Sequence, residues 1–544
     1  MRVNLIDIFK KDISEINLHI EQSRIHNIEY LGPENPELPY ILPGFTDSHV
    51  HIESSMLTPT QFARLAVVHG TVATVSDPHE IANVLGVPGV EFMIEDGKRT
   101  PFKFCFGAPS CVPATIFETA GATVDAEQIG QLLAREDIGY LAEVMNFPGV
   151  LHEDPDMMAK IAWAKKYSKV IDGHAPGLRG EDAKKYAGNG ITTDHECYTY
   201  EEAKEKIGYG VKILIREGSA ARNFNALIPL IAEFPDQIMF CSDDKHPDNL
   251  VQGHINVLVK RALNLGYNLW DILLAACINP VLHYSLPVGL LRIGDAADFI
   301  KIDDPTDFNI LETWLNGELV AENGVSKLPD LRSSHPNKFN CSLKTTNDFS
   351  CAPEKDFSGT VRVIEALEGQ LITNELQLTV TLKDGLLVPD IERDILKLVV
   401  INRYEDAQPA IAFIRNFGLK SGAIASSVAH DSHHVIAVGA DDESIAAAVN
   451  LIIKSKGGIS AVGNEEKHLL PLPIAGLMSD ADGYELAGTY TAIDHFVKEQ
   501  LKSTLKSPYM TLSFMALLVI PALKLSDKGL FDGGSFGFVP LSVR

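Results

Sequence analysis

Eight short runs rich in β-branched and aromatic residues alternate with amphipathic helical segments between residues 41 and 287. Parallel strands need long crossover connections, so eight such alternations predict an α/β fold with a closed (β/α)8 barrel. The expected helices cover Pro59–His69, Ala126–Arg135, Pro155–Tyr167, Glu201–Ile207 and Leu250–Leu265. The expected strands end at His49–His51, TVATVSD (71–77), FKFCFGAPS (102–110), GYLAEVM (139–145), KVIDGH (169–174), GITTDH (190–195), VKILIRE (211–217) and QIMFCSDD (237–244).

Regions outside 41–287 predict three further parts of the chain. Residues 1–40 and 288–325 contain short β-like runs on both flanks of the barrel, so we expect them to pair into one composite small β domain. Residues 326–358 are rich in Ser, Pro, Asn, Asp and Lys, which is typical of a linker. Residues 359–544 contain a further set of strand-like and helical runs and predict an additional α/β domain.

Composition excludes some partners and favours one compartment. A formal net charge of −25 argues against nucleic acid, which is normally bound by a basic surface. The seven cysteines form no CxxC pair and are odd in number, as expected for reduced thiols in the cytoplasm. The most apolar stretch, 510–523, contains Pro521 and is too short to span a bilayer, so we expect no membrane association.

Residues able to bind metal follow the expected barrel strands. His49 and His51 are two residues apart, and in an extended strand such side chains point the same way. Active sites of barrel enzymes lie at the C-terminal ends of the strands, where further donors are expected. The complete candidate ligand set is His49, His51, Glu143, His174, His195 and Asp243.

Four imidazoles and two carboxylates suit zinc, iron(II) or manganese(II). Six ligands exceed what one four-coordinate ion needs, so we expect two divalent ions bridged by a carboxylate. Such ions lower the pKa of water toward about 7 and generate hydroxide at neutral pH. Asp243 is then placed to accept the proton of that hydroxide and transfer it to a leaving group.

The HVH motif after the first strand, with His174, His195 and Asp243 after later strands, resembles the amidohydrolase superfamily. GDAADFIKI, just after the barrel, resembles a strand of that superfamily's composite β domain. Many members carry a carboxylated lysine as the bridging ligand after the fourth strand. Here YLAEVMNFPG has no lysine, and the resemblance assigns the bridge to Glu143. The nearby Lys169 lies at the opposite, N-terminal end of its strand.

Longer strings narrow the resemblance to the adenine deaminase family, over essentially the whole chain: PGFTDSHVHIESSMLTP, VSDPHEIANVLG, AEVMNFPGV, DGHAPGL, DHECYT, REGSAARN, CSDDKHP, SSVAHDSHHVIAVG and LKLSDKGLFD. This resemblance implies hydrolysis of adenine to hypoxanthine and ammonia, Mn(II) or Fe(II) in preference to Zn(II), and a homodimer or larger oligomer. Two alternatives stay open: hydrolysis of another cyclic amide or amino-heterocycle, and a non-catalytic metal-stabilised binding protein.

Deamination at C6 of a purine also needs an acid to protonate the ring nitrogen N1. The candidates are Glu80, Glu53 and Glu217, and we favour Glu80 because it follows a strand end in SDPHE. Glu53, Arg216 and Glu217 are candidate substrate-binding residues. For Arg216, an ion pair with a strand-end acid is an equal alternative.

Several neighbouring polar residues are assigned weaker roles. Asp243 and Asp244 are adjacent, so an extended strand would turn Asp244 away from the cavity. We expect His246 to be a loop histidine without a necessary role. The segment SSVAHDSHH, with His430, His433 and His434, is either a polar turn, which we favour, or a segment that reaches and closes the active site.

Overall fold

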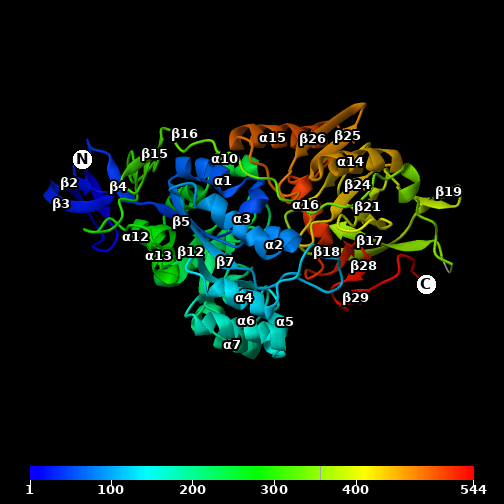
Figure 1. Ribbon diagram of the computed structural model, residues 1–544, viewed down its shortest axis with the longest axis horizontal. Helices are drawn as coiled ribbons and strands as arrows, with labels where there is room; N and C mark the ends of the chain where they lie inside the picture. The colour runs from blue at the N-terminus through cyan, green and yellow to red at the C-terminus, as the bar shows by residue number, and fades with distance from the viewer. Residues whose placement is uncertain (356, 544) are drawn as a thin grey trace.

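The computed structural model describes residues 1–355 and 357–543, and a barrel of eight parallel strands lies at its centre (Figure 1). Five strands pair in chain order and three more continue the ring. The strands are β5 (Phe45–Val50), β6 (Thr71–Ser76), β7 (Lys103–Ala108), β8 (Ile138–Val144), β9 (Val170–Gly173), β10 (Thr193–Asp194), β11 (Lys212–Arg216) and β12 (Ile238–Cys241). All eight expected strands are therefore present.

Backbone hydrogen bonds close this ring at both seams. Thr192 N donates to Ile171 O at 2.9 Å, which joins the two sheets between β9 and β10. At the other seam Asp243 N donates to His49 O at 2.9 Å, and His51 N donates to Asp243 O at 3.3 Å. The first and last strands of the barrel thus meet at three of the predicted metal ligands.

Helices follow the strands around the outside of the barrel. They include α1 (Pro59–Ala66), α2 (His79–Leu85), α3 (Val87–Gly97), α4 (Ala126–Leu133), α5 (Phe147–Leu151), α6 (Pro155–Lys166), α7 (Gly180–Gly188), α8 (Tyr200–Gly208), α9 (Phe224–Leu227), α10 (Pro247–Gln252), α11 (Ile255–Asn264), α12 (Leu269–Leu273) and α13 (Asn279–Tyr284).

The expectation of one helix over Leu250–Leu265 was wrong, because the chain breaks between α10 and α11 at Gly253 and His254. The break directs the His254 side chain into the barrel. Its Nε2 lies 2.7 Å from Asp47 Oδ2, and its Nδ1 lies 2.7 Å from Thr71 Oγ1.

Segments from both flanks of the barrel share one eight-stranded sheet in the order β16-β15-β14-β13-β4-β1-β2-β3. The central contact is antiparallel, between β13 and β4. The strands are β1 (Arg2–Asp7), β2 (Asp12–Glu21), β3 (Arg24–Pro33), β4 (Tyr40–Pro43), β13 (Phe299–Ile302), β14 (Ile310–Leu315), β15 (Glu318–Glu322) and β16 (Val325–Ser326). In Figure 1 this sheet lies at the left, away from the C-terminal region.

The C-terminal region contains a second eight-stranded sheet, in the order β18-β17-β22-β21-β24-β23-β25-β26. Its strands are β17 (Thr360–Ala366), β18 (Thr373–Thr379), β21 (Ile395–Ile401), β22 (Ala410–Arg415), β23 (Ala423–Ser426), β24 (Val435–Gly439), β25 (Gly458–Gly463) and β26 (Glu466–Pro471). Short hairpins add β19 (Thr381–Lys383), β20 (Leu386–Val388), β27 (Leu523–Ser526), β28 (Gly529–Asp532) and β29 (Gly537–Phe538).

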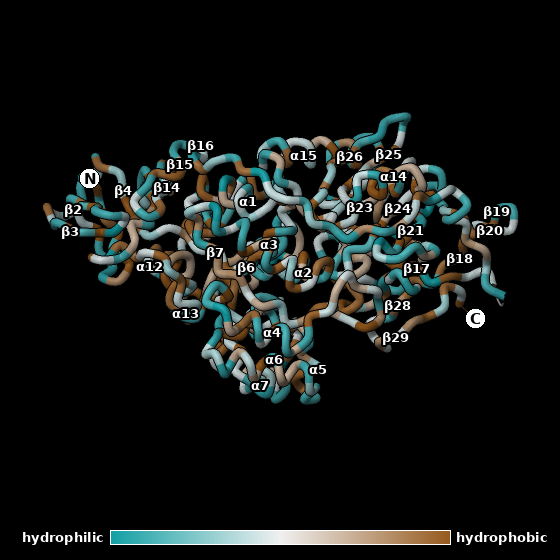
Figure 2. Tube along the Cα trace, in the orientation of Figure 1, coloured by the Kyte–Doolittle hydropathy of each residue, from teal (hydrophilic) through white to brown (hydrophobic). Residues whose placement is uncertain are grey.

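Alternate residues of this second sheet face two different cores, as strand geometry requires. Val399 and Ile401 pack in a cluster with α14 (Asp442–Ser455). Leu398 and Val400 belong instead to the large core that also contains the barrel. Apolar segments accordingly gather inside both regions and at their junction (Figure 2). The C-terminal region is therefore packed onto the barrel through a common core.

Two further segments tie the C-terminal region to the barrel. The chain that follows β16 is held at separate points: Ser333 N donates to Asp480 Oδ2 at 2.8 Å, and Phe349 is fully buried beside α14. Helix α15 (Gly483–Glu499) lies against α1 and α10 of the barrel, whereas α16 (Pro508–Ser513) packs on β23 and β24 within the C-terminal region. Within the described residues, none of the helices combines the length and apolarity required to cross a bilayer.

Candidate active site

The six predicted ligands converge at the C-terminal mouth of the barrel. His49 Nε2 and His51 Nε2 lie 3.1 Å apart, with Val50 between the two residues in the sequence. Asp243 Oδ1 lies 3.5 Å from His49 Nε2 and 3.2 Å from His51 Nε2. The rings of His49 and His195 are stacked with their centroids 4.0 Å apart. All six residues are therefore close enough to share ions.

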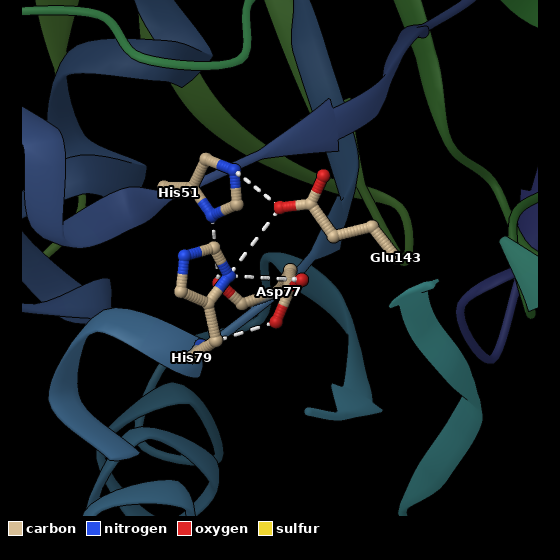
Figure 3. A group of neighbouring side chains, drawn as sticks. All are labelled: His51, Asp77, His79 and Glu143. Atoms are coloured by element: carbon tan, nitrogen blue, oxygen red, sulfur yellow. Dashed lines mark hydrogen bonds and ion pairs between the residues drawn. The ribbon is translucent and has the colours of Figure 1, made fainter. Parts of the chain in front are cut away.

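Glu143 lies between two pairs of imidazoles. Its Oε1 is 3.4 Å from both His51 Nε2 and His79 Nδ1. Figure 3 marks both contacts with dashed lines. Its Oε2 is 2.7 Å from His174 Nδ1 and 3.2 Å from His195 Nε2. Burial favours the neutral acid, but the neighbouring His174 and His195 hold the pKa of Glu143 well below its usual range. A carboxylate whose two oxygens face different donor sets has the arrangement of a bridging ligand.

The donor set fits divalent cations. Six carboxylates and one guanidinium line the cavity, an excess of negative charge that a cation would offset. His51 Nδ1 lies 3.2 Å from the carbonyl oxygen of Asp77, so it carries the proton and leaves Nε2 free as a ligand. His49 Nδ1 is buried without a hydrogen-bond partner in the described chain. Two groups with atoms within 4.8 Å overlap at His49, namely His49–His51–Asp243 and His49–Glu143–His195.

Arg216 is engaged with strand-end acids. Its Nη1 donates to Glu196 and, at 2.7 Å, to Asp243 Oδ2. The ion-pair alternative is therefore realised, although the guanidinium also lines the cavity.

The three candidate acids are placed differently. Glu80 lines the cavity, whereas Glu53 lies behind its wall and accepts the Ile81 N–H at 3.2 Å. Burial raises the pKa of Glu53 to about 7. Glu217 directly follows β11, is absent from the cavity lining and pairs with Arg261 Nη1 at 3.1 Å. Of the three, only Glu80 lines the cavity; Glu53 and Glu217 do not.

The expectation for Asp244 was wrong, and His246 lies in a loop as expected. Asp244 lines the cavity together with Asp243 and accepts a hydrogen bond from Ser54. The backbone φ of Asp243 is +54°, so the chain is not extended there and the two side chains need not alternate. His246 is buried and its Nδ1 lies 2.6 Å from the Tyr490 hydroxyl, which links the barrel to α15.

The segment SSVAHDSHH contacts Glu80 in the active site. The favoured expectation, a polar turn away from the site, was therefore wrong. His430 Nδ1 contacts one carboxylate oxygen and His433 Nε2 contacts the other. Ala429 N–H donates to His433 Nδ1 at 3.2 Å, so Nε2 carries the proton that is donated to Glu80. Burial opposes charge on His430, but Glu80 and Asp244 raise its pKa to about 9. Burial lowers the pKa of His433 to about 4, so that ring is neutral.

Comparison with known proteins covers almost the entire chain. The amidohydrolase family model matches residues 40–320, and the adenine deaminase C-terminal domain model matches residues 370–537. An adenine deaminase from Sulfurovum sp. is 55% identical over 99% of both chains. One from Salinibacter ruber is 53% identical over 98% of this chain and 97% of its own. The chain belongs to the adenine deaminase family.

A solved β-aspartyl dipeptidase from Fervidobacterium islandicum AW-1 is 15% identical, covers 60% of this chain and 97% of its own, and gives a TM-score of 0.44. The adenine deaminase from Methanosarcina mazei is 52% identical over 99% of this chain and 98% of its own. The adenine deaminase family relatives thus match the C-terminal region as well as the barrel.

In this adenine deaminase family member, the C-terminal region also covers the cavity with apolar side chains. The covering residues are Leu371, Phe514, Leu517, Val519 and Ile520. Phe514 stacks on His430 with ring centroids 4.8 Å apart. Buried Lys524 donates to the carbonyl oxygens of Leu371, at 2.6 Å, and Phe514, at 3.0 Å. The cavity therefore has a polar floor from the barrel and a largely apolar cover.

Sequence reasoning assigned no role to several cavity residues. Asp77 holds His79 Nδ1 at 3.1 Å, and Glu196 binds Arg216. Asp77 precedes His79 by two residues in SDPHE, as Asp47 precedes His49 in TDSHVH, whereas Glu196 directly follows His195 in TDHE. The repeated spacing was an available signal for Asp77. His434 does not reach Glu80; its Nε2 lies 3.2 Å from Asp527 Oδ1.

Proposed function

We propose that this protein hydrolyses adenine to hypoxanthine and ammonia in the cytoplasm, as a homodimer or larger oligomer. The observation that carries this proposal is the full-length similarity to curated adenine deaminases, 55% identical for one of them. The converging polar residues and the apolar cover support it, because the cover suits a face of a flat aromatic base while polar groups are available to its edge.

The proposed metal ligands are His49, His51, Glu143, His174, His195 and Asp243, holding two divalent ions. Mn(II) and Fe(II) are favoured over Zn(II) on the family resemblance, and the nitrogen and oxygen donors accommodate all three. Such ions, when bound, lower the pKa of a water molecule and so supply a nucleophile near neutral pH.

The chain's own residues then handle protons at two places. Asp243 Oδ1 faces the imidazoles of His49 and His51, while Arg216 holds the other oxygen. We assign Asp243 to accept the proton lost by water and to transfer it to the departing amine. Arg216 keeps that carboxylate oriented and does not itself bind the base.

We assign Glu80 to protonate ring nitrogen N1 as C6 becomes tetrahedral. Of the three acids considered, it is the one at the cavity wall. Burial favours the neutral acid, but His430 and His433 hold the pKa of Glu80 well below its usual range, so the protonated His430 is the source of the proton that Glu80 passes to N1. The second proton of the attacking water returns through Glu80 to His430 as the C6 carbonyl forms, and His433 fixes the second oxygen of Glu80. A carboxylate held by two imidazoles from another domain is thereby oriented for repeated proton transfer.

The test is ammonia release from adenine by apoprotein reconstituted separately with Mn(II), Fe(II) and Zn(II). Hypoxanthine and ammonia in equal amounts, with adenosine unreacted, are the expected products. Folded protein that releases no ammonia with any of the three ions would contradict the proposal.

A further inference from the structure

Among the described residues that line the cavity, one carboxylate oxygen has no hydrogen-bond partner. Asp431 lines the cavity beside His430, and its side chain is 5% exposed. Its Oδ2 forms no hydrogen bond within residues 1–355 and 357–543. Burying a carboxylate oxygen without a partner costs free energy, and native structures seldom leave such a group unless a ligand satisfies it.

The position of Asp431 relative to the proposed metal ligands suggests which group donates a hydrogen bond to its free oxygen. Its Oδ1 lies 3.8 Å from His79 Nε2, beyond hydrogen-bond length, and His79 Nδ1 lies 3.4 Å from Glu143 Oε1. One imidazole ring therefore separates Asp431 from the proposed bridging carboxylate. A purine carries its amino carbon on the six-membered ring and its ring N–H on the fused five-membered ring. When the amino carbon lies at the proposed metal ligands, the N–H of the five-membered ring can face Asp431.

We propose that Asp431 accepts the imidazole-ring N–H of the purine and thereby selects the free base over N9-substituted purines. A nucleoside has no such proton, so its binding would leave the carboxylate buried and unpaired. Sites built to pair with a substrate N–H or O–H reject analogues lacking it by roughly 10⁴-fold or more. This inference rests on the proposed function for the identity of the base.

The cover of the cavity reinforces this selection. Leu371, Phe514 and Leu517 present apolar surface that suits the face of a base and offers a sugar's hydroxyl groups no partner. Asp431 therefore recognises the edge of the base by a hydrogen bond, and the apolar cover packs against its face.

The experiment uses manganese-reconstituted full-length protein and three substrates: adenine, 9-methyladenine and 7-methyladenine. Neither methylated base has a ring N–H, and the methyl group occupies a different place in each. We expect kcat/KM of the wild type to fall by at least about 1,000-fold for both methylated bases. If either is deaminated as efficiently as adenine, the inference is overturned without any variant.

Variants separate recognition from structure. In Asp431→Ala we expect kcat/KM for adenine to fall while the adenine to 9-methyladenine ratio collapses to about tenfold or less. Asp431→Asn, which keeps the side-chain shape, should lower the ratio partly. If both substrates lose activity equally in folded variants, Asp431 has only a structural role and the inference fails.

Glu118→Gln is the matched control. Glu118 is a buried acid next to Asp431 that does not line the cavity, and burial together with Asp431 raises its pKa well above the usual range. Glutamine mimics that neutral acid, so the substrate ratio should stay at the wild-type value.

Calorimetric binding of hypoxanthine and 9-methylhypoxanthine judges the inference separately from the proposed activity. Wild-type protein should prefer hypoxanthine, and Asp431→Ala should lose that preference. If adenine yields no ammonia but this preference is present and depends on Asp431, the deaminase proposal fails while base recognition stands. Equal binding of the two bases by the wild type overturns the inference.

Discussion

The barrel builds its side of the cavity from strand ends distributed between His49 and Asp243, whereas the C-terminal region builds its side from one loop, 429–434, and residues 371 and 514–520. Strand ladders place the barrel residues, and packing between two regions places the others. We therefore expect the barrel residues to control metal content and the C-terminal residues to control protonation and substrate choice with metal content unchanged.

The largest expected effect tests the barrel side. Glu143→Gln removes a charge that faces four imidazoles, so metal content measured by elemental analysis should fall and ammonia release should drop about 1,000-fold or more. Glu217→Gln, another strand-end acid that is absent from the cavity lining, should change neither quantity. Full metal content and activity in Glu143→Gln would contradict the assignment of Glu143 as the bridging ligand.

The next effect concerns the acid where the two sides meet. Glu80→Gln keeps the shape but cannot release and regain a proton, so kcat should fall by roughly 10²- to 10⁴-fold. Metal content should stay at the wild-type level, because Glu80 is outside the proposed ligand set. Loss of metal along with activity would assign Glu80 to the ions instead.

A smaller effect is expected from the C-terminal loop. His430→Ala leaves Glu80 held by His433 alone, and orienting partners of this kind are worth about 10- to 100-fold in activity. The control is His434→Asn, which changes a neighbouring imidazole that does not contact Glu80. Equal effects of the two variants on kcat would mean that the loop acts through stability alone.

The smallest expected effect is on stability and depends on pH. Burial lowers the pKa of Lys524 from 10.5 to about 7. Between these values the unfolded chain binds the extra proton, so this residue makes unfolding harder as pH rises from 7 to 10.5, by at most about 1.4 kcal/mol per pH unit. Thermal midpoints of wild type and Lys524→Met at pH 7, 8 and 9 should show this rise in the wild type only. Parallel pH dependence would contradict it.

The strands and their donors could be predicted from sequence because both depend on local patterns. Alternation of side chains places His49 with His51, and the parallel barrel brings all strand ends to one mouth. The pairing of Glu80 with His430 could not, since those residues are 350 positions apart and meet only through inter-domain packing. Asp244 was misplaced because nothing in SDDKH reveals the positive φ of Asp243.

The seam between β5 and β12 has a consequence for how the protein matures. Since the last strand docks onto the first through the peptide groups of His49, His51 and Asp243, completing the cylinder and gathering these donors are one event. A chain still being synthesised that has not reached residue 243 lacks both. We therefore expect metal ions to bind only after the barrel has closed, and a bound ion to stabilise the closed barrel against opening between β5 and β12.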